Sequence, residues 1–369
     1  MTAVASPLNV TLTVSIGVDP DDSARALRAA PPRRPPRFTV VLPVRDGRRY
    51  VAECVESVLG QSCGDLALEV LENGSTDGTA EWLRTVRDPR LRVWPAPRAL
   101  PIEQNWQRAR ALEKGEFLLF VSHDDRLDVG FLAIVDTLIR RCQDAALYTT
   151  HFRLIDAEGR VLSSCHPVPA RESAAELLTS RLAYQREMSG VGIVMRSSAY
   201  DAAGGIPLFE GLAHADDALW LALLDGSWKA TAPDEAFSYR LHPGSAFHSL
   251  AWRPAVAAIE RYAAFVESFG QTRADVREVW RAHASRFLER RYRAILLTAM
   301  LGEAAGPGGL SAADREEILR SLDRLDPPAG RRLRRRWWLR VGARAGATRL
   351  GTPLMAGCRV YWRYRRPWR

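Results

Sequence analysis

Acidic and polar side chains follow three apolar runs of this sequence, and they are the first candidates for chemistry. Asp46 follows the first run, Glu72 and Asn73 end the second, and Asp124 with Asp125 follows the third. Glu72 can accept hydrogen bonds from hydroxyl or amide donors, and the two aspartates offer the hard oxygen ligands that Mg²⁺ or Mn²⁺ prefers. The three runs with their polar ends are VVLPVRDG, VLENGSTDGT and FLLFVSHDD.

A strand followed by a helix is the arrangement that should carry each of these groups. Each run is rich in β-prone residues and stops at a polar or Gly-rich loop, and apolar residues at helical spacing come next. Repeated units of this kind predict an α/β fold with a mostly parallel sheet flanked by helices. Because ligands bind outside the carboxyl ends of the strands in such sheets, we expect the three loops to meet at one crevice.

The pattern along the chain predicts further elements. After residue 150 it is less regular, with a hairpin over 152–161 and a last strand over 236–241. A helical pattern covers 251–300 and resumes after a Gly/Pro break at 302–309. The other expected strands are 38–43, 66–71, 91–94, 117–121, 145–150 and 191–195, and the other expected helices are 50–59, 75–86, 101–112, 130–141 and 218–223.

Composition predicts a globular protein. The chain has 369 residues, 47% of them hydrophobic, and domains average roughly 150 residues, so we expect two domains. No stretch approaches the ~18 uncharged apolar residues of a membrane span. The five cysteines are widely spaced and form no CxxC pair, which argues against disulfides and structural zinc and fits a reducing cytosol. Residues 1–36 lack the order of a signal peptide and should form a disordered Pro/Arg-rich leader.

The positive charge of the chain is concentrated at its carboxyl end. The formal net charge is +9, and residues 331–369 contain thirteen arginines and no acidic residue, so the remaining 330 residues carry about −4. Trp and Tyr residues interleave with these arginines, which favours a segment that lies on an anionic bilayer. A solvated tail is the main alternative, and a nucleic-acid-binding segment is the weakest of the three interpretations.

Five segments together resemble a known family. In order and spacing they are similar to the inverting family 2 glycosyltransferases of the GT-A fold, over about residues 37–249. The resemblance implies a GT-A domain at 37–249, a helical extension at 250–330 and the basic tail at 331–369. The segments are VVLPVRDGRRYVAECVESVL, LENGSTDGTAEWL, NWQRARALEKGEFLLFVSHDD, HADDALWLALLDG and YRLHPGS.

The resemblance also implies which residues bind a nucleotide-sugar donor. Ser122 stands where the family usually has an Asp that faces the ribose, and Glu72 stands where the family usually has Asp. The donor-binding residues implied in this way are Pro43, Val44, Arg45, Asp46, Glu72, Asn73, Ser122 and Asp124.

A cation site and a general base follow from the same resemblance. Asp124 would hold Mn²⁺ or Mg²⁺, and His242 matches a histidine found near the diphosphate or metal in some relatives. Asp217 matches the aspartate that serves the family as general base, with Asp216 in place of a Glu. In the implied mechanism Asp217 takes the proton of an acceptor hydroxyl, whose oxygen displaces the metal-bound diphosphate in one inverting step.

The expected function is metal-dependent transfer of a sugar from a UDP-, GDP- or dTDP-sugar to a glycan or lipid-linked acceptor in cell-surface polysaccharide synthesis. We expect the protein in the cytoplasm, peripheral on the inner face of the plasma membrane, and not bound to nucleic acid. A non-catalytic nucleotide-sugar-binding protein of the same fold is the alternative, which Ser122 and Asp216 leave open. A sugar-1-phosphate nucleotidyltransferase is less favoured, because LPVRDGRRY is not a Gly-rich phosphate loop.

Overall fold

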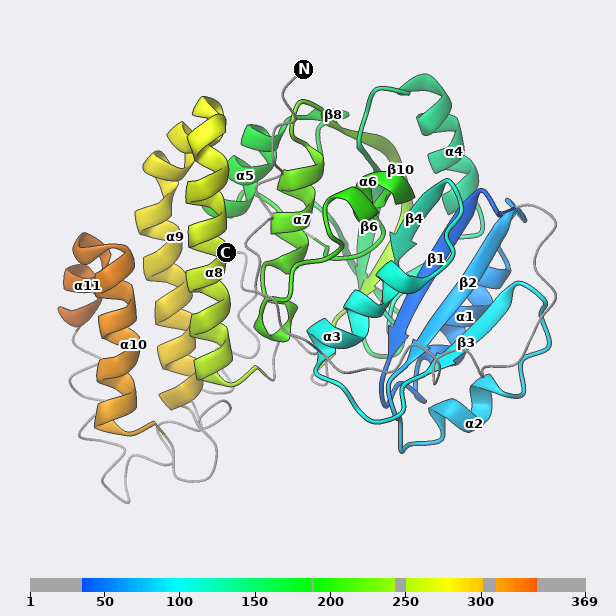
Figure 1. Ribbon diagram of the computed structural model, residues 1–369, viewed down its shortest axis with the longest axis horizontal. Coiled ribbons are helices and arrows are strands. Elements are labelled where there is room, and N and C mark those ends of the chain that lie inside the picture. Colours follow the sequence, from blue (N-terminus) through cyan, green and yellow to red (C-terminus); the bar gives the residue numbers. More distant parts are fainter. Residues whose placement is uncertain (1–34, 188, 243–249, 301–309, 337–369) are drawn as a thin grey trace. The chain divides into compact units, whose positions relative to one another are not determined.

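The chain divides into two compact units, which the computed structural model describes over residues 35–187, 189–242, 250–300 and 310–336 (Figure 1). The predicted leader up to residue 34, the Gly/Pro break and residues 337–369 of the predicted tail lie outside the described residues. The first unit comprises the described residues up to Ser173 together with Ser189–Leu208 and Leu219–Leu241, and the second comprises the remainder.

Four parallel strands form the centre of the sheet in the first unit. They are β1 (Phe38–Val44), β2 (Leu66–Glu72), β3 (Leu91–Pro95) and β4 (Phe117–Phe120). β1 lies between β2 and β4, and β3 extends the sheet beyond β2 (Figure 1). Every residue of β1 is buried, which explains why all of them except Thr39 are apolar and the strand does not alternate. Because the strands are parallel, their carboxyl ends share one edge of the sheet.

The other half of the sheet is mixed. β9 (Val194–Arg196) lies antiparallel between β4 and β6 (Leu147–Ile155), and β10 (Lys229–Arg240) runs parallel to β6. β5 (Arg126–Leu127) directly follows the Asp124–Asp125 pair and is antiparallel to β10. The short strands β7 (Val161–Ser164) and β8 (Arg171–Glu172) pair with β6 and β10.

Helix α1 (Val51–Leu59) illustrates how the helices of this unit form. Its buried residues are Val51, Cys54, Val55 and Val58, the spacing of one helical face. The other helices are α2 (Thr79–Leu83), α3 (Ile102–Gln107) with a 3₁₀ turn at Arg108–Ala111, α4 (Phe131–Arg141), α6 (Ser197–Ala202) and the later part of α7 (Ala215–Leu223).

The predicted α/β fold is confirmed, and the boundaries differ at β6 and β10. β6 continues through Ile155, and β10 begins at Lys229 instead of 236. The early part of β10 contains Pro233, and its pairing with β6 shifts register between Ala232 and Glu235. A proline inside a strand is typical of such an irregularity, so local pattern concealed a strand that pairing with β6 supports.

Long helices make up the second unit. α8 (Trp252–Thr272) and α9 (Ala274–Met300) lie side by side, and α5 (Ala174–Ala183) packs on α9 (Figure 1). α10 (Ala312–Leu325) begins at a capping box, and α11 (Pro327–Arg334) begins with proline in its first turn. The predicted C-terminal helical region is therefore present.

The first residues of the predicted basic tail belong to this helical unit. Arg332 pairs with Glu289 at 2.7 Å, and Arg334 pairs with Glu316 at 2.8 Å and with Asp323 at 2.7 Å. These ion pairs offset part of the positive charge before residue 337. None of the helices in the described ranges is both long and apolar enough to cross a bilayer.

Candidate functional site

The loops that follow β1 and β2 are joined by hydrogen bonds. The Asp46 amide donates to Ser75 Oγ at 3.0 Å, and the Asp46 carboxylate accepts from the Thr76 amide at 2.7 Å. The Arg48 amide donates to Asp77 Oδ2 at 2.8 Å. Asp46 has a φ of 51°, a left-handed conformation that Asp tolerates better than most residues. The two loops therefore form one surface at the carboxyl edge of the sheet.

The loop after β4 meets that surface at Gly47. The Gly47 amide donates to Thr79 Oγ1 at 3.0 Å. A Cβ atom at position 47 would lie 2.6 Å from the His123 ring and 2.7 Å from the Val44 side chain, so a residue without a side chain is needed there. Three loops that are distant in sequence thus meet within the first unit, as the strand–loop pattern predicts.

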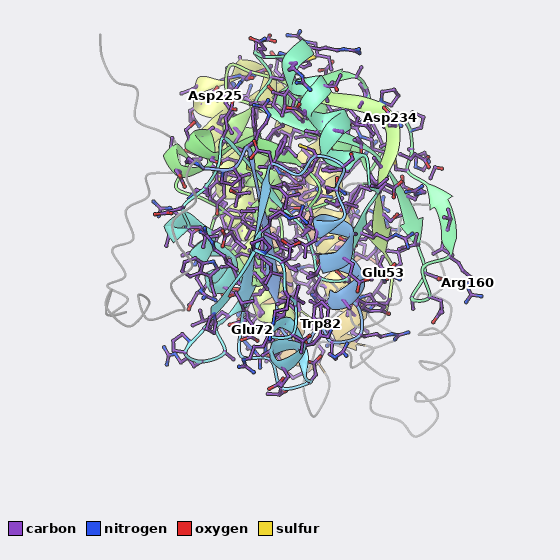
Figure 2. All side chains as sticks on the ribbon, turned by 90° about the vertical axis from the view of Figure 1, so that its right-hand side faces the viewer. Glu53, Glu72, Trp82, Arg160, Asp225 and Asp234 are labelled. Atoms are coloured by element: carbon purple, nitrogen blue, oxygen red, sulfur yellow. The ribbon has the colours of Figure 1, made fainter. Side chains whose placement is uncertain are left out.

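Glu72 and Asn73 shape the loop after β2. Glu72 is labelled in Figure 2. Glu72 is 4% exposed, and its carboxylate accepts from the amides of Gly74 at 3.2 Å and Ser75 at 2.6 Å. The Asn73 side chain forms two hydrogen bonds with the Leu100 backbone, at 2.9 and 2.8 Å. Contact of either residue with a nucleoside stays a prediction.

The other predicted residues of the first loop differ in exposure. Pro43 and Val44 are buried and end β1 opposite Leu71 and Glu72. The Arg45 side chain is exposed, and its Nε lies 3.6 Å from the Asp46 carboxylate. Arg45 is therefore a cation that a charged ligand can reach.

The loop after β4 carries two buried carboxylates. Asp124 is 8% and Asp125 is 2% exposed. Asp125 Oδ1 accepts from the Arg240 amide at 2.8 Å, while Oδ2 has no hydrogen-bond partner among the described residues. Burial, together with the charge of Asp124, raises the pKa of Asp125 well above its ordinary value. Ser122 is partly exposed, and its carbonyl accepts from the Asp125 amide at 3.1 Å.

These carboxylates fit a divalent cation as part of a ligand set. Across the ranges that the structure describes, no group of three His, Cys, Asp or Glu side chains is placed to hold a metal ion. Mg²⁺ at nucleotide sites commonly binds one or two carboxylates plus substrate phosphates. Asp124, alone or with Asp125, would supply the one or two carboxylates, and phosphate oxygens of a ligand would complete the coordination.

Asp217 forms a buried ion pair in the second unit. Asp217 is 2% exposed, and its Oδ2 accepts from Arg181 Nε at 2.6 Å and from His214 Nδ1 at 2.9 Å. The His214 ring stacks on Tyr262 at 4.8 Å and meets Phe287 edge-on at 5.5 Å. Burial lowers the pKa of His214 to about 4, so the ring is neutral at pH 7 and its Nδ1 proton is assigned to the bond with Asp217.

Asp216 has a different environment, although it is the next residue. Its side chain is 20% exposed, and its Oδ2 lies 4.0 Å from the Arg181 guanidinium. Burial and the negative charge of Asp217 raise the pKa of Asp216 to about 7. Burial also acts to raise the pKa of Asp217, but the charge of Arg181 and the bond from His214 outweigh it and hold that pKa below its ordinary value. One carboxylate is thus held ionised, and the other can exchange a proton near neutral pH.

The predicted residues divide between the two units. Asp217 and His242 belong to the second unit, and His242 is partly exposed just after β10. Their action on one donor with residues of the first unit stays a prediction. The predicted residues in the first unit are Pro43, Val44, Arg45, Asp46, Glu72, Asn73, Ser122 and Asp124.

Sequence reasoning missed Arg181, His214 and Arg240. His214 lies two residues before the acidic pair, and Arg240 lies in the YRLHPGS segment two residues before His242, but neither residue type at these positions signals a role by itself. In a chain so rich in arginine, only burial distinguishes these arginines from solvated ones.

Comparison with known proteins identifies related sequences. Residues 39–189 match the family model described as Glycosyl transferase family 2. Chondroitin synthase of Escherichia coli is 28% identical over 151 residues, which is 40% of this chain and 22% of that protein. Hyaluronan synthase of Pasteurella multocida is 25% identical over 158 residues, 42% of this chain and 16% of that protein. The chain therefore spans about a fifth of the length of these curated relatives.

The fold has a solved counterpart. The crystal structure of residues 1–349 of S. aureus TarS in complex with UDP has a TM-score of 0.56 with this chain and is 16% identical to it. The match covers 89% of this chain and 93% of that one. At this identity the likeness is one of fold.

Proposed function

We propose that this chain, whose residues 39–189 match the glycosyl transferase family 2 model, transfers a sugar from a nucleotide-sugar donor to an acceptor hydroxyl, with inversion and with a divalent cation. The acceptor that we propose is a glycan or a lipid-linked glycan of cell-surface polysaccharide synthesis. Its support is the similarity to proteins named chondroitin synthase and hyaluronan synthase.

The meeting of three loops at one edge of the sheet is the observation that carries this proposal. Asp46, Ser75 and Thr76 join the first two loops, and Gly47 brings His123 of the third against them. A ligand at this edge can contact all three loops at once, as ligands of open α/β sheets do. We assign the donor to this edge.

Individual residues have separate parts in donor binding. Arg45 is an exposed cation of the edge and can pair with a diphosphate oxygen, whereas Glu72 and Asn73 hold the loop that the nucleoside would contact. Asp124 would hold Mn²⁺ or Mg²⁺, and we keep His242 as a second candidate ligand. When bound, the cation offsets the negative charge of the departing diphosphate.

The base belongs to the Asp216–Asp217 pair, and we favour Asp216. The family resemblance points to Asp217, whose bonded oxygen is already held by Arg181 and His214. Asp216 keeps a partly exposed side chain and a pKa of about 7, which suits a group that takes a proton from a hydroxyl near neutral pH. In this proposal Asp217 remains ionised beside Asp216 and raises its basicity.

Thermal unfolding with nucleoside diphosphates tests the donor site. We expect UDP, GDP or dTDP to raise the unfolding temperature, and Mn²⁺ to increase that rise. UDP is the first to test, since the TarS structure of similar fold contains it. Asp124→Ala should abolish the contribution of Mn²⁺, because the buried carboxylate is the proposed ligand.

Asp234→Ala is the matched control, because Asp234 is an exposed carboxylate of the same unit that lies away from Glu72 (Figure 2). It should behave as the wild type does. Failure of all three nucleotides to stabilise the protein would contradict the proposal. Stabilisation without release of nucleoside diphosphate from any nucleotide-sugar would instead favour the non-catalytic alternative, which the replacement of the family's Asp by Ser122 supports.

A further inference from the structure

Arg240 is a buried arginine that bonds to both aspartates of the loop after β4. Its side chain is 2% exposed. Its Nε donates to the carbonyl oxygen of Asp124 at 2.7 Å, and its main-chain amide donates to Asp125 Oδ1 at 2.8 Å. The last residue of β10 thus holds two consecutive residues that lie more than a hundred positions earlier in the chain.

The rest of the guanidinium joins further segments of the first unit. Its two terminal nitrogens donate to the carbonyls of Asp156 at 3.2 Å and Ala157 at 3.3 Å, and to Glu53 Oε2 at 2.5 Å. The guanidinium carbon lies 4.6 Å from the centre of the Tyr50 ring. The turn after β6 and helix α1 are therefore tied to the backbone of Asp124 through one side chain.

Strand pairing by itself does not account for an arginine at this place. β10 is already held by its pairing with β6 and β5, and a buried cation is costly unless its partners are well placed. A lysine carries one point charge and could not bond Asp124, Asp156 and Glu53 together, whereas the planar fork of arginine can. Two donors of Arg240, Nε and the main-chain amide, bond to the loop that presents Asp124.

We propose that Arg240 is a positioning residue for Asp124: by fixing the Asp124 carbonyl through Nε, it sets the direction in which the Asp124 carboxylate meets a cation-bound diphosphate. This inference rests on the proposed function, in which Asp124 holds the cation. A carboxylate whose backbone is fixed loses less conformational freedom when it binds. Loss of the guanidinium should therefore weaken cation binding more than it changes the nucleoside contacts.

A titration with Mn²⁺ tests this role. The nucleotide is UDP, GDP or dTDP, whichever stabilises the wild type, and the readout is the thermal stabilisation of the protein by that nucleotide. Arg240→Gln and Arg240→Lys should raise the Mn²⁺ concentration for half-maximal stabilisation by ~10-fold or more, the usual cost of losing a residue that orients a metal ligand. Stabilisation by the nucleotide alone should change little. Free guanidinium at millimolar concentration should restore part of the Mn²⁺ affinity to Arg240→Ala, while urea should not.

Arg126→Gln is the matched control, because Arg126 also pairs with Glu53, at 2.8 Å, and none of the hydrogen bonds among the described residues joins its side chain to Asp124. It should keep the wild-type Mn²⁺ midpoint. If Arg240→Gln does not fold, Arg240→Lys, which keeps the buried charge, provides the test of the positioning role. An unchanged midpoint in the Arg240 variants, with the Mn²⁺ effect abolished in Asp124→Ala, would overturn the positioning role and leave the proposed function standing. If the wild type shows no effect of Mn²⁺, the proposed cation site fails, and this inference fails with it.

Discussion

Two adjacent aspartates at the start of α7 have opposite properties. Asp217 is buried against Arg181 and His214, and the charge of Arg181 outweighs burial and holds its pKa low. Asp216 keeps part of its carboxylate exposed, and burial with the charge of Asp217 brings its pKa to about 7. A general base works best when its pKa is near the working pH, so the two residues make different predictions about activity.

The pH dependence of donor turnover separates the two candidates. The base must be deprotonated, so with Asp216 as base kcat/KM should fall as the pH drops through about 7, the pKa of that residue. With Asp217 as base, its lowered pKa would leave kcat/KM flat from pH 7 down to 5. Release of nucleoside diphosphate from the donor, measured between pH 5 and 9 at constant ionic strength, gives the profile. A flat profile would argue against Asp216.

Substitution of each aspartate gives an independent test. Asp216→Asn should lower kcat by ~10²–10⁴, the usual contribution of a general base, with little change in the unfolding temperature because the side chain is partly exposed. Asp217→Asn removes the closer of the two carboxylates that pair with the Arg181 cation and should cost about 3 kcal/mol of folding free energy. Donor turnover and urea unfolding are measured on both proteins. Full turnover in Asp216→Asn would return the base to Asp217.

The connection from β1 to α1 depends on close approach of three loops. Gly47 starts the turn that leads into α1, since its carbonyl accepts from the Val51 amide at 2.9 Å. The same residue leaves room for His123, which follows β4. The loops at the ends of the parallel strands are therefore held together by packing at Gly47 as well as by hydrogen bonds.

Gly47→Ala should disturb the packing of these three loops. A Cβ atom there meets the His123 ring at 2.6 Å and the Val44 side chain at 2.7 Å, so both must move. We expect a loss of about 1–3 kcal/mol in folding free energy, the usual cost of overpacking, and weaker nucleoside diphosphate binding. Urea unfolding and calorimetric titration measure the two effects.

Gly64→Ala is the control for this change, because a Cβ atom at position 64 has no heavy atom of another residue within 4 Å. It should leave both stability and nucleotide affinity close to wild type. Equal nucleotide affinity in Gly47→Ala and Gly64→Ala would show that the contact with His123 does not shape the donor site.

At the level of the complete chain, charge is distributed unevenly. Arg332 and Arg334 are held by ion pairs within the helical unit, so attachment to an anionic membrane would depend on residues 337–369. That segment contains eight arginines and no acidic residue. Basic residues near an anionic surface contribute about 1 kcal/mol each, and salt screens this attraction.

Deletion of residues 337–369 tests the proposed membrane attachment. α11 and its ion pairs end before residue 337, so the second unit should keep its fold. We expect the full chain to sediment with vesicles that contain phosphatidylglycerol, less so as salt is raised, and the shortened chain to remain in solution. Nucleotide-induced stabilisation should be the same in both. Equal sedimentation of the two proteins would contradict the attachment, and preference of the full chain for duplex DNA over vesicles would replace it.

Local pattern was sufficient for much of the first unit. The strands at Phe38, Leu66, Leu91 and Phe117, and the polar loops that end them, follow from apolar runs and helical spacing, which depend on near neighbours in the chain. Their meeting at one edge follows from parallel pairing. The early part of β10 was missed, because Pro233 breaks the local pattern while pairing with β6 supports the strand.

The environment of each polar group was decided by contacts that the local pattern does not reveal. The amino-acid types alone make Asp216 and Asp217 nearly equivalent, and Glu72 an open acceptor. Arg181, which is 36 positions away, holds Asp217, while the Glu72 carboxylate turns back onto its own loop and Arg240 reaches across 116 positions to Asp124. Burial and electrostatic environment depend on which segments fold together in space, and that information is absent from any short stretch of sequence.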